Sequence, residues 1–508
     1  MASDMDAATA DAPVAGRSSN RLLFAGVLVL GAWLRIHGFD QPGLWVDEYG
    51  TWWVVAADDY AGVAARAWQV QGQSPLYYLI VRGCVDLFGL ASWSLRLPSL
   101  IFGILALALG YAVTRDLFRD RRVALMAMAA LALHAPLIRY SQEARPYALA
   151  LALSFASFML FSRVLRGGGI GERVAYALVT AATLYAHYLF GFVLIVQAGY
   201  ASCRRSAGRR SALLALGASA LCMAPAAPQL WNLFARRQSL DWVAVPASMP
   251  EALATVAQKF IDPWPLALSA LTVVVLLAFG ARAWRGDPDD QGGLVLAWFL
   301  VPFALVALML SLFDVNLIAT RYLLFAAPAA RILIGALLAI PRRRALTDAL
   351  PLLVFTLASF TSVLLPHHAR TGTFAFREDQ HWDTAVSEML SSYREGDRVL
   401  LASRFVEMDL VAAGTASEST RDFVTWPLEA HLPAELDLPY APLPYSVSPT
   451  TEPMFEAIAR RSAAAPRVWI MGAGPSIRTI TKLIAEDPRI KFARDDRHGG
   501  IRLILLKR

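Results

Sequence analysis

Long apolar runs separated by short polar loops are the dominant pattern along this chain. Most of these runs approach the ~20 residues that an α-helix needs to cross a bilayer. The pattern therefore predicts a polytopic α-helical membrane protein with about eleven transmembrane helices. The predicted spans are Leu22–Phe39, Leu97–Thr114, Val123–Tyr140, Tyr147–Leu165, Val174–His187, Leu189–Ala201, Ala212–Leu230, Pro265–Ala283, Leu294–Phe313, Tyr322–Ile340 and Ala349–Pro366.

Arginine is concentrated in alternate loops, and this sets the orientation of the chain. Cytoplasmic loops of membrane proteins carry an excess of Lys and Arg, and the loops that fit are 115–122, 163–173, 204–210, 282–285 and 342–344. The other loops then share the outer face with everything after Pro366. The segment Ser74–Phe88 is too short to span, and we expect it to be interfacial or re-entrant. The Trp- and Tyr-rich residues Gly50–Gln73 predict interfacial helices in the first outer loop.

Composition agrees with a membrane protein and excludes other classes. The 508 residues are 56% hydrophobic and 17% charged, with a mean hydropathy of +0.46, which is too apolar for an ordinary soluble globule. The formal charge of +7 goes with arginine patches between apolar runs, so we expect no nucleic acid partner. Cys84, Cys203 and Cys222 are too far apart in sequence to indicate a disulfide framework or a zinc site.

Three regions are predicted from these patterns. Residues 1–20 are small and polar and read as a disordered cytoplasmic tail. Residues 21–366 form the membrane domain, whose first apolar run lacks the cleavage site of a signal peptide and is predicted to be an anchor. Residues 367–508 form a small extracytoplasmic α/β domain. Its predicted elements are a helix at His381–Arg394, strands at Arg398–Ser403 and Arg467–Met471, and two strands within Arg489–Arg508.

The sequence Gly472-Ala473-Gly474-Pro475-Ser476 in this domain follows a predicted strand and precedes a predicted helix. That context is typical of nucleotide-binding turns. The full glycine fingerprint is absent, however, and a nucleotide outside the cell is not expected. An ordinary strand-turn-helix accounts for the motif.

Short polar motifs fall at the outer ends of the predicted spans. In chain order they are Asp47-Glu48, Ser74-Pro75-Leu76-Tyr77-Tyr78, Arg96-Leu97-Pro98-Ser99, Ser141-Gln142-Glu143-Ala144-Arg145-Pro146-Tyr147, His187-Tyr188 and Arg321-Tyr322-Leu323. This order resembles the bacterial family-39-like C-type (GT-C) glycosyltransferases. These include the protein mannosyltransferases, the aminoarabinose transferase of lipid A and the rhizobial galacturonosyl transferases. The resemblance covers about residues 20–370 and implies a GT-C fold, whereas the outer domain matches in position only.

The resemblance also implies an activity. Such enzymes take a sugar from a polyprenyl-phosphate carrier and transfer it, outside the cytoplasm and with inversion, to a hydroxyl on an envelope lipid, glycan or protein. The attacking hydroxyl must lose its proton, and a carboxylate near the interface is a suitable general base. We assign this role to Asp47, which matches the first acid of the family's pair, and an orienting or metal-associated role to Glu48.

The departing phosphate calls for fixed cations at the depth of the headgroups. Arg145 and Arg321 lie at predicted outer ends of spans, where an ordinary snorkelling anchor is the alternative for each. The other candidates for binding the donor or substrate are Glu143, Tyr147, His187, Tyr188 and Tyr322.

A divalent metal cation is a candidate cofactor, because some members of the family use one. Its candidate ligands are Glu48, Glu143 and His187. Glu143 is alternatively an ion-pair partner of Arg145, and His187 a histidine satisfied at the interface. Many members carry His-Pro-Pro before Leu-Tyr-Tyr, where this chain has Gln73-Ser74-Pro75. This departure puts the metal in doubt.

Two other classes of protein share such an architecture. A transporter or glycolipid flippase is expected to have internal repeats and ionisable residues near the middle of the bilayer. In this chain the charges are concentrated on the outer face instead. If the chain is a non-catalytic envelope assembly protein, the Asp47 carboxylate should be dispensable. We favour a glycosyltransferase of the bacterial inner membrane, with its active site and outer domain on the extracytoplasmic side.

Overall fold

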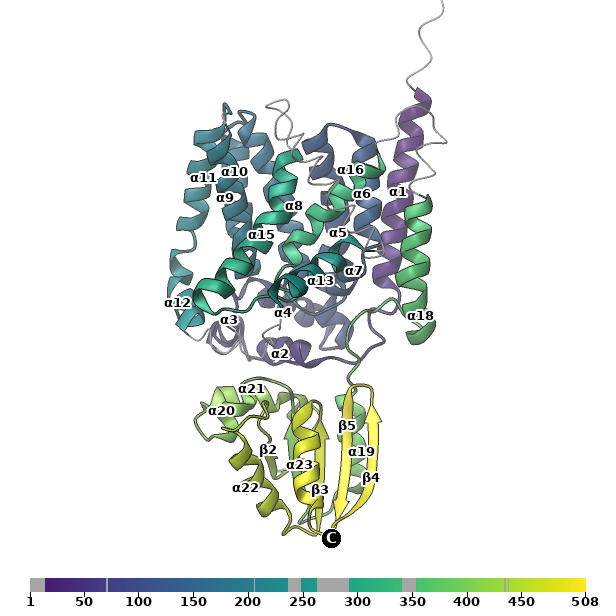
Figure 1. Ribbon diagram of the computed structural model, residues 1–508, viewed down its shortest axis with the longest axis vertical. Coiled ribbons are helices and arrows are strands. Elements are labelled where there is room, and N and C mark those ends of the chain that lie inside the picture. Colours follow the sequence, from purple (N-terminus) through teal and green to yellow (C-terminus); the bar gives the residue numbers. More distant parts are fainter. Residues whose placement is uncertain are drawn as a thin grey trace, which may run out of the picture.

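The protein consists of a helical bundle stacked on a smaller α/β domain, which we call the outer domain (Figure 1). The computed structural model describes residues 14–69, 72–204, 206–235, 248–262, 292–339, 353–433, 435–436 and 438–508. The chain completes the bundle before it enters the outer domain. Residues 372–381, the connecting segment, join the last helix of the bundle to the first helix of the outer domain.

The bundle is built from helices of unequal length. They are α1 (Val14–Ile36), α5 (Ser92–Phe118), α6 (Arg121–Ala132), α7 (Ala135–Ser141), α8 (Tyr147–Leu165), α9 (Ile170–Ala186), α10 (Phe192–Cys203), α11 (Arg209–Leu221), α12 (Ala227–Ala235), α13 (Met249–Ile261), α15 (Gly292–Phe313), α16 (Ala327–Leu338) and α18 (Leu365–Thr371). Short turns join several of them, namely η1 (Tyr188–Gly191), η2 (Ala224–Ala226), η4 (Leu324–Ala326) and the π-helical η5 (Phe360–Leu364).

Four helical segments among the described residues are long and apolar enough to cross a membrane. They are Ser92–Phe118, Tyr147–Leu165, Arg209–Asn232 and Gly292–Phe313, and α6 with α7, which are bent by 67°, make a fifth if they act as one span. The predicted count of about eleven is not confirmed. Several predicted spans form shorter apolar helices, such as Tyr188–Cys203 and Leu324–Leu338. Pro265–Ala283 lies outside the described residues, and Ala349–Pro366 lies partly outside them.

Three short helices fill the first outer loop, where the sequence predicts helices. They are α2 (Val46–Val55), α3 (Tyr60–Gln69) and α4 (Leu76–Phe88), and they lie at the end of the bundle that faces the outer domain (Figure 1). With 13 residues, α4 is too short to span a bilayer. The first turn of α2 contains both Asp47 and Glu48, which is where negative side chains favour a helix.

The outer domain contains a five-stranded mixed sheet in the order β2-β1-β3-β5-β4. β1 (Arg398–Ala402), β2 (Tyr440–Pro442) and β3 (Arg467–Gly472) are parallel, and β5 (Ile501–Lys507) is antiparallel to β3 and to β4 (Lys491–His498). The helices are α19 (Trp382–Ser392), α20 (Met408–Ala412), α21 (Glu418–Glu429), α22 (Glu452–Ser462) and α23 (Pro475–Ala485). The four predicted strands and the predicted helix of this domain are confirmed, whereas β2 was not predicted.

Both faces of this sheet are covered, because alternate residues of a strand point to opposite sides. Leu400 of β1 packs in a small core with Phe455 of α22 and Ile480 of α23. Val399 points the other way, into a larger core that includes Trp382 of α19 and continues into the bundle.

Aromatic side chains join the outer domain to the bundle. The ring of Trp53 in α2 lies 5.4 Å from that of Phe423 in α21. The Tyr49 hydroxyl is 2.7 Å from Nε2 of His431. The helix that contains the two acids is therefore packed between the bundle and the outer domain.

Candidate active site

The two adjacent acids of α2 lie in different environments. Neighbouring residues point about 100° apart around an α-helix, so one side chain turns into the protein while the other stays accessible. The Glu48 side chain is fully buried, whereas that of Asp47 is 22% exposed. Of this pair, Asp47 is the acid that a substrate can reach.

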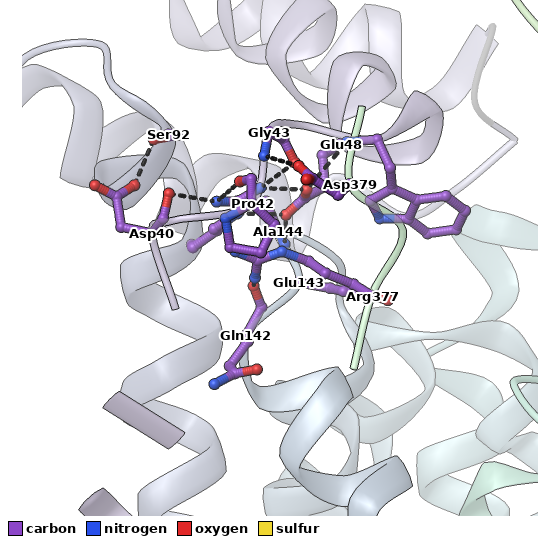
Figure 2. A network of polar contacts seen from close by, with 12 residues as sticks. Asp40, Pro42, Gly43, Glu48, Ser92, Gln142, Glu143, Ala144, Arg377 and Asp379 are labelled. Atoms are coloured by element: carbon purple, nitrogen blue, oxygen red, sulfur yellow. Dashed lines mark hydrogen bonds and ion pairs between the residues drawn. The ribbon is translucent and has the colours of Figure 1, made fainter. Parts of the chain in front are cut away.

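Glu48 is held by a buried ion pair with Arg96 of α5. Arg96 donates from Nε to Oε1 at 2.8 Å and from Nη2 to Oε2 at 2.7 Å. The main-chain N–H of Ala144 also donates to Oε1, at 2.9 Å (Figure 2). Burial raises the pKa of Glu48, but the charge and hydrogen bonds of Arg96 outweigh it and hold the pKa below its ordinary value. Glu48 is therefore an ionised structural anchor.

Arg96 also fixes the loop that leads into α2. It donates to the carbonyl oxygens of Pro42 at 2.9 Å and Gly43 at 3.0 Å. Gly43 is held from the other side by the connecting segment, because its N–H donates to Asp379 Oδ1 at 2.8 Å (Figure 2). A Cβ on Gly43 would lie 2.1 Å from the Gln380 carbonyl oxygen, so a residue without a side chain is required there.

Two arginines from distant parts of the chain meet at Asp47. Arg321, which precedes η4, donates from Nη1 to Asp47 Oδ2 at 3.1 Å. Arg145, which precedes α8, donates from Nη1 to the Asp47 carbonyl oxygen at 3.3 Å. The same atom of Arg145 lies 3.4 Å from the hydroxyl of Tyr78 in α4. The structure thus brings together three of the residues that the sequence predicts for the site.

Hydrogen bonds between the motifs position Arg145. Ser99 of α5 donates to the Arg145 carbonyl oxygen at 3.0 Å, and the Tyr77 hydroxyl is 2.7 Å from Ser99 Oγ. These residues belong to three motifs that are separate in the sequence. Their convergence explains why the chain carries them at the outer ends of α4, α5 and α7.

Aromatic side chains line the surroundings of the two arginines. Tyr322 lies beneath Arg321, whose guanidinium carbon is 5.0 Å from the centre of its ring. The rings of Tyr147 and His187 lie 5.2 Å apart, and His187 accepts a hydrogen bond from the N–H of Leu189 at 3.3 Å. Tyr188 instead donates to Gln229 of α12. The Gln229 side chain in turn donates to two carbonyl oxygens of the first outer loop, those of Trp68 and Gln73.

Glu143 pairs with Arg139 and not with Arg145, the partner that its sequence position allowed. Arg139 of α7 donates to its Oε1 at 2.6 Å, so the ion pair forms across one helical turn and not with Arg145. Its Oε2 is buried and has no hydrogen-bond partner. Burial raises the pKa of Glu143, and the charge of Arg139 offsets this only in part.

The candidate metal ligands do not fit a metal site. The described part of the chain contains no group of three or more His, Cys, Asp or Glu side chains that could hold an ion. Both oxygens of Glu48 already accept hydrogen bonds from Arg96. We therefore derive no role for a metal from these residues.

Two functional positions received no role from the sequence. Arg96 stands in one of the quoted motifs, so its position carried a signal, but nothing identified its partner. Arg377 of the connecting segment donates to the carbonyl oxygen of Gln142 (Figure 2) and to that of Phe39. It lies 330 residues after the first acid, and no local pattern marks it.

Part of the chain matches a known protein family. Residues 72–232 match the family described as dolichyl-phosphate-mannose-protein mannosyltransferase. This segment contains α4, the Arg96 motif and the Arg145 motif. No curated protein sequence matches the chain.

Solved structures show the fold. The chain is similar to ArnT from Cupriavidus metallidurans bound to undecaprenyl phosphate, at 14% identity and a TM-score of 0.57, over 96% of this chain and 98% of that one. The apo state of the same protein gives a TM-score of 0.55 at the same identity and coverage.

A third similar structure is the archaeal oligosaccharyltransferase AglB from Archaeoglobus fulgidus, in complex with an inhibitory peptide and a dolichol-phosphate. It is 11% identical, with a TM-score of 0.50 over 90% of this chain and 70% of that one. The fold is that of the GT-C membrane proteins, and the predicted resemblance to glycosyltransferases of the protein mannosyltransferase and ArnT type is confirmed.

Proposed function

We propose that the protein is an integral membrane glycosyltransferase that transfers a sugar from a polyprenyl-phosphate carrier to a hydroxyl on an envelope lipid, glycan or protein. The mannosyltransferase match and the ArnT-like fold support this class of reaction. The observation that carries the proposal is the arrangement of Asp47, a partly exposed carboxylate, beside Arg321 and Arg145. A base and two cations are what sugar transfer from a phosphate requires.

Asp47 is the general base in this proposal. Its neighbour Glu48 is buried and fully engaged with Arg96, so Asp47 is the carboxylate of the pair that is available to accept a proton once it is released from Arg321. Glu48 and Arg96 fix the start of α2, and with it the position of the Asp47 side chain. General-base catalysis typically contributes 10²–10⁴-fold.

Arg321 and Arg145 stabilise the departing polyprenyl phosphate. Burial lowers the pKa of Arg321, but Tyr147 and Asp47 raise it by a larger amount. The pKa of Arg321 therefore lies above its ordinary value. For Arg145, burial also lowers the pKa, and Tyr78 and Asp47 more than compensate. Both side chains therefore stay cationic, as stabilisation of a growing negative charge demands. When the donor binds, its phosphate replaces Asp47 as the partner of Arg321 and releases the carboxylate for proton transfer.

The reaction inverts the anomeric centre in this proposal. The hydroxyl attacks the anomeric carbon opposite the phosphate, its proton passes to Asp47, and the bond from the anomeric carbon to the phosphate oxygen breaks. We place this site on the extracytoplasmic side of a bacterial inner membrane, because the arginine-rich loops 115–122 and 163–173 lie at the ends of α5 and α8 that are opposite the site.

The test is complementation of a deletion strain, followed by mass spectrometry of its envelope lipids and glycans. The wild-type gene should restore a sugar-sized mass, and Asp47→Asn should reduce the product about 100-fold or more. Asp58→Asn serves as the control, since Asp58 is an exposed acid of the same outer loop. If Asp47→Asn restores the product at matched protein levels, Asp47 is not the base and transport or assembly becomes the better explanation.

A further inference from the structure

The outer domain has a topological switch point that the proposed reaction does not use. β1 lies between β2 and β3, and all three strands are parallel. From β1 the chain crosses to β2 on one side and then returns to β3 on the other. In open α/β sheets, ligands bind at the carboxyl ends of the strands where the crossovers diverge in this way.

A pocket lies at this edge of the sheet. It is lined by residues that directly follow each of the three parallel strands, among them Ser403 and Arg404 after β1, Tyr445 after β2, and Gly474 after β3. Arg404 is the only charged residue among those that line it. Ligand pockets in this position usually combine an apolar wall with a few convergent polar groups.

The beginning of α23 gives the pocket a preference for anions. The N-cap residue Gly474 has φ +100° and has no side chain to bind the free N–H groups of the first turn. Gly472 also has a positive φ, of +137°, and a Cβ there would lie 2.0 Å from the Ala402 carbonyl oxygen. Free N–H groups and the helix dipole together favour a negatively charged ligand.

Ser403 supplies an independent sign of a ligand. Its side chain is 0% exposed, and its Oγ has no hydrogen-bond partner within the protein. Buried hydroxyl groups are normally paired, so an unpaired one in a pocket needs an explanation. By contrast, Ser476 is already satisfied, because it donates to the Pro444 carbonyl oxygen at 2.5 Å.

Arg404 adds a cation and connects the pocket to the bundle. It is a non-glycine residue with φ +70°, a conformation that is found mainly where function or packing demands it. Its Nη1 donates to Glu378 of the connecting segment at 2.8 Å. Arg377, the preceding residue of that segment, binds the Gln142 carbonyl oxygen in the bundle. The pocket thus lies next to the segment that helps to build the candidate active site.

The direction of the strands agrees with this placement. β5 ends at the edge of the outer domain that lies away from the bundle, and β3 runs antiparallel to it (Figure 1). The carboxyl ends of β1 and β3 therefore point toward the bundle. A phosphate in the pocket would be on the same side of the outer domain as Asp47.

We propose that this pocket binds a phosphate group carried by the acceptor lipid, held by the first turn of α23, Ser403 Oγ and Arg404. The assignment to an acceptor rests on the proposed glycosyltransferase function, whereas the anion site itself does not. In this arrangement the outer domain holds the acceptor while the bundle holds the donor. The outer domain would then select phosphorylated acceptors.

The test is thermal unfolding of the full-length protein in a neutral detergent. Sodium phosphate should raise the unfolding midpoint of the wild type above that in sodium chloride of equal ionic strength, because a ligand that binds the folded state stabilises it. Ser403→Ala and Arg404→Gln should each lose about half of this shift or more. In the absence of phosphate, Ser403→Ala should have the same unfolding midpoint as the wild type, since the Ser403 Oγ makes no hydrogen bond that the variant could lose. Arg461→Gln, which removes an exposed arginine of α22, should keep the full shift.

A second arm identifies the source of the phosphate. Dihexanoyl phosphatidic acid should raise the unfolding midpoint of the wild type, and Ser403→Ala should lose about half of this shift or more. Dihexanoyl phosphatidylcholine should not raise the midpoint. Equal phosphate shifts in all variants would overturn the anion site, and a response to inorganic phosphate alone would overturn its assignment to a lipid. Asp47→Asn should retain the shift, so this test can fail or succeed independently of the proposed chemistry.

Discussion

Removal of the Glu48 carboxylate should strongly destabilise the protein. Arg96 is 0% exposed and has Glu48 as its ion-pair partner. Breaking a buried ion pair by removing one partner costs about 3–5 kcal/mol, because the other charge stays buried without compensation. Glu48→Ala would also deprive the Ala144 N–H of its acceptor, which costs about 1–3 kcal/mol more. Glu48→Gln keeps a hydrogen-bond acceptor for the Ala144 N–H, so its destabilisation should lie at the lower end of the range for the broken ion pair.

The double variant Glu48→Met/Arg96→Met should recover part of this loss, since neither charge of the pair remains buried. It should not recover all of it, because Arg96 also binds the carbonyl oxygens of Pro42 and Gly43. The assay is thermal unfolding of each purified variant in detergent, with sugar transfer measured below the unfolding midpoint. Glu456→Gln is the matched control, because its pair with Arg460 is exposed and worth about 0–1 kcal/mol.

Glu48 acts here as a positioning residue, and its lowered pKa makes the stability of the protein depend on pH. A carboxyl group whose pKa is lowered by folding stabilises the protein above its unfolded pKa, and this contribution is lost as the pH falls through the folded pKa. Glu48→Gln should therefore remove part of the loss of stability in acid. Loss of sugar transfer in Glu48→Gln with an unchanged unfolding midpoint would refute the structural role and place Glu48 in the chemistry.

Three further variants test the surroundings of the site. The unfolding midpoint of Glu143→Gln should rise relative to that of the wild type as the pH rises above the ordinary pKa of a glutamate. The raised pKa of Glu143 means that stability in the wild type is lost as this carboxyl group ionises. Arg377→Met should speed proteolysis of the connecting segment and lower sugar transfer, since Arg377 links that segment to two carbonyl oxygens of the bundle. Gly43→Ala should also speed proteolysis of the connecting segment and lower sugar transfer, because the new Cβ would collide with the Gln380 carbonyl oxygen.

Gly43→Ala has a matched control, and specific results would contradict the predictions for Gly43→Ala and Glu143→Gln. Gly171→Ala adds a Cβ in open space and should have no effect on proteolysis. An unchanged cleavage rate in Gly43→Ala would show that the connecting segment does not press on that loop. A midpoint difference for Glu143→Gln that does not vary with pH would show that Glu143 does not titrate in this range.

Local sequence patterns determined much of the secondary structure and the kinds of residue in the site. Short apolar runs were enough to predict β1, β3 and β5, which are buried on both faces along most of their length. The turn at His498-Gly499-Gly500 separated β4 from β5. The long apolar runs likewise predicted α5, α8 and α15. The motif that contains Arg145 was recognisable because its residues are contiguous. The number of spans was not determined in this way, since run length does not show whether a helix is bent or broken, as it is between α6 and α7.

Tertiary structure alone decided the partners and roles of these residues. Asp47 and Glu48 are equivalent by sequence, and the packing of α2 against Arg96 decides which one is buried. Arg321 reaches Asp47 across 274 positions, and Arg377 reaches Gln142 across 235. Contacts at such separations depend on how helices pack, and no local pattern encodes them. The same holds for the pocket of the outer domain, which exists because three strands end at one edge of a sheet.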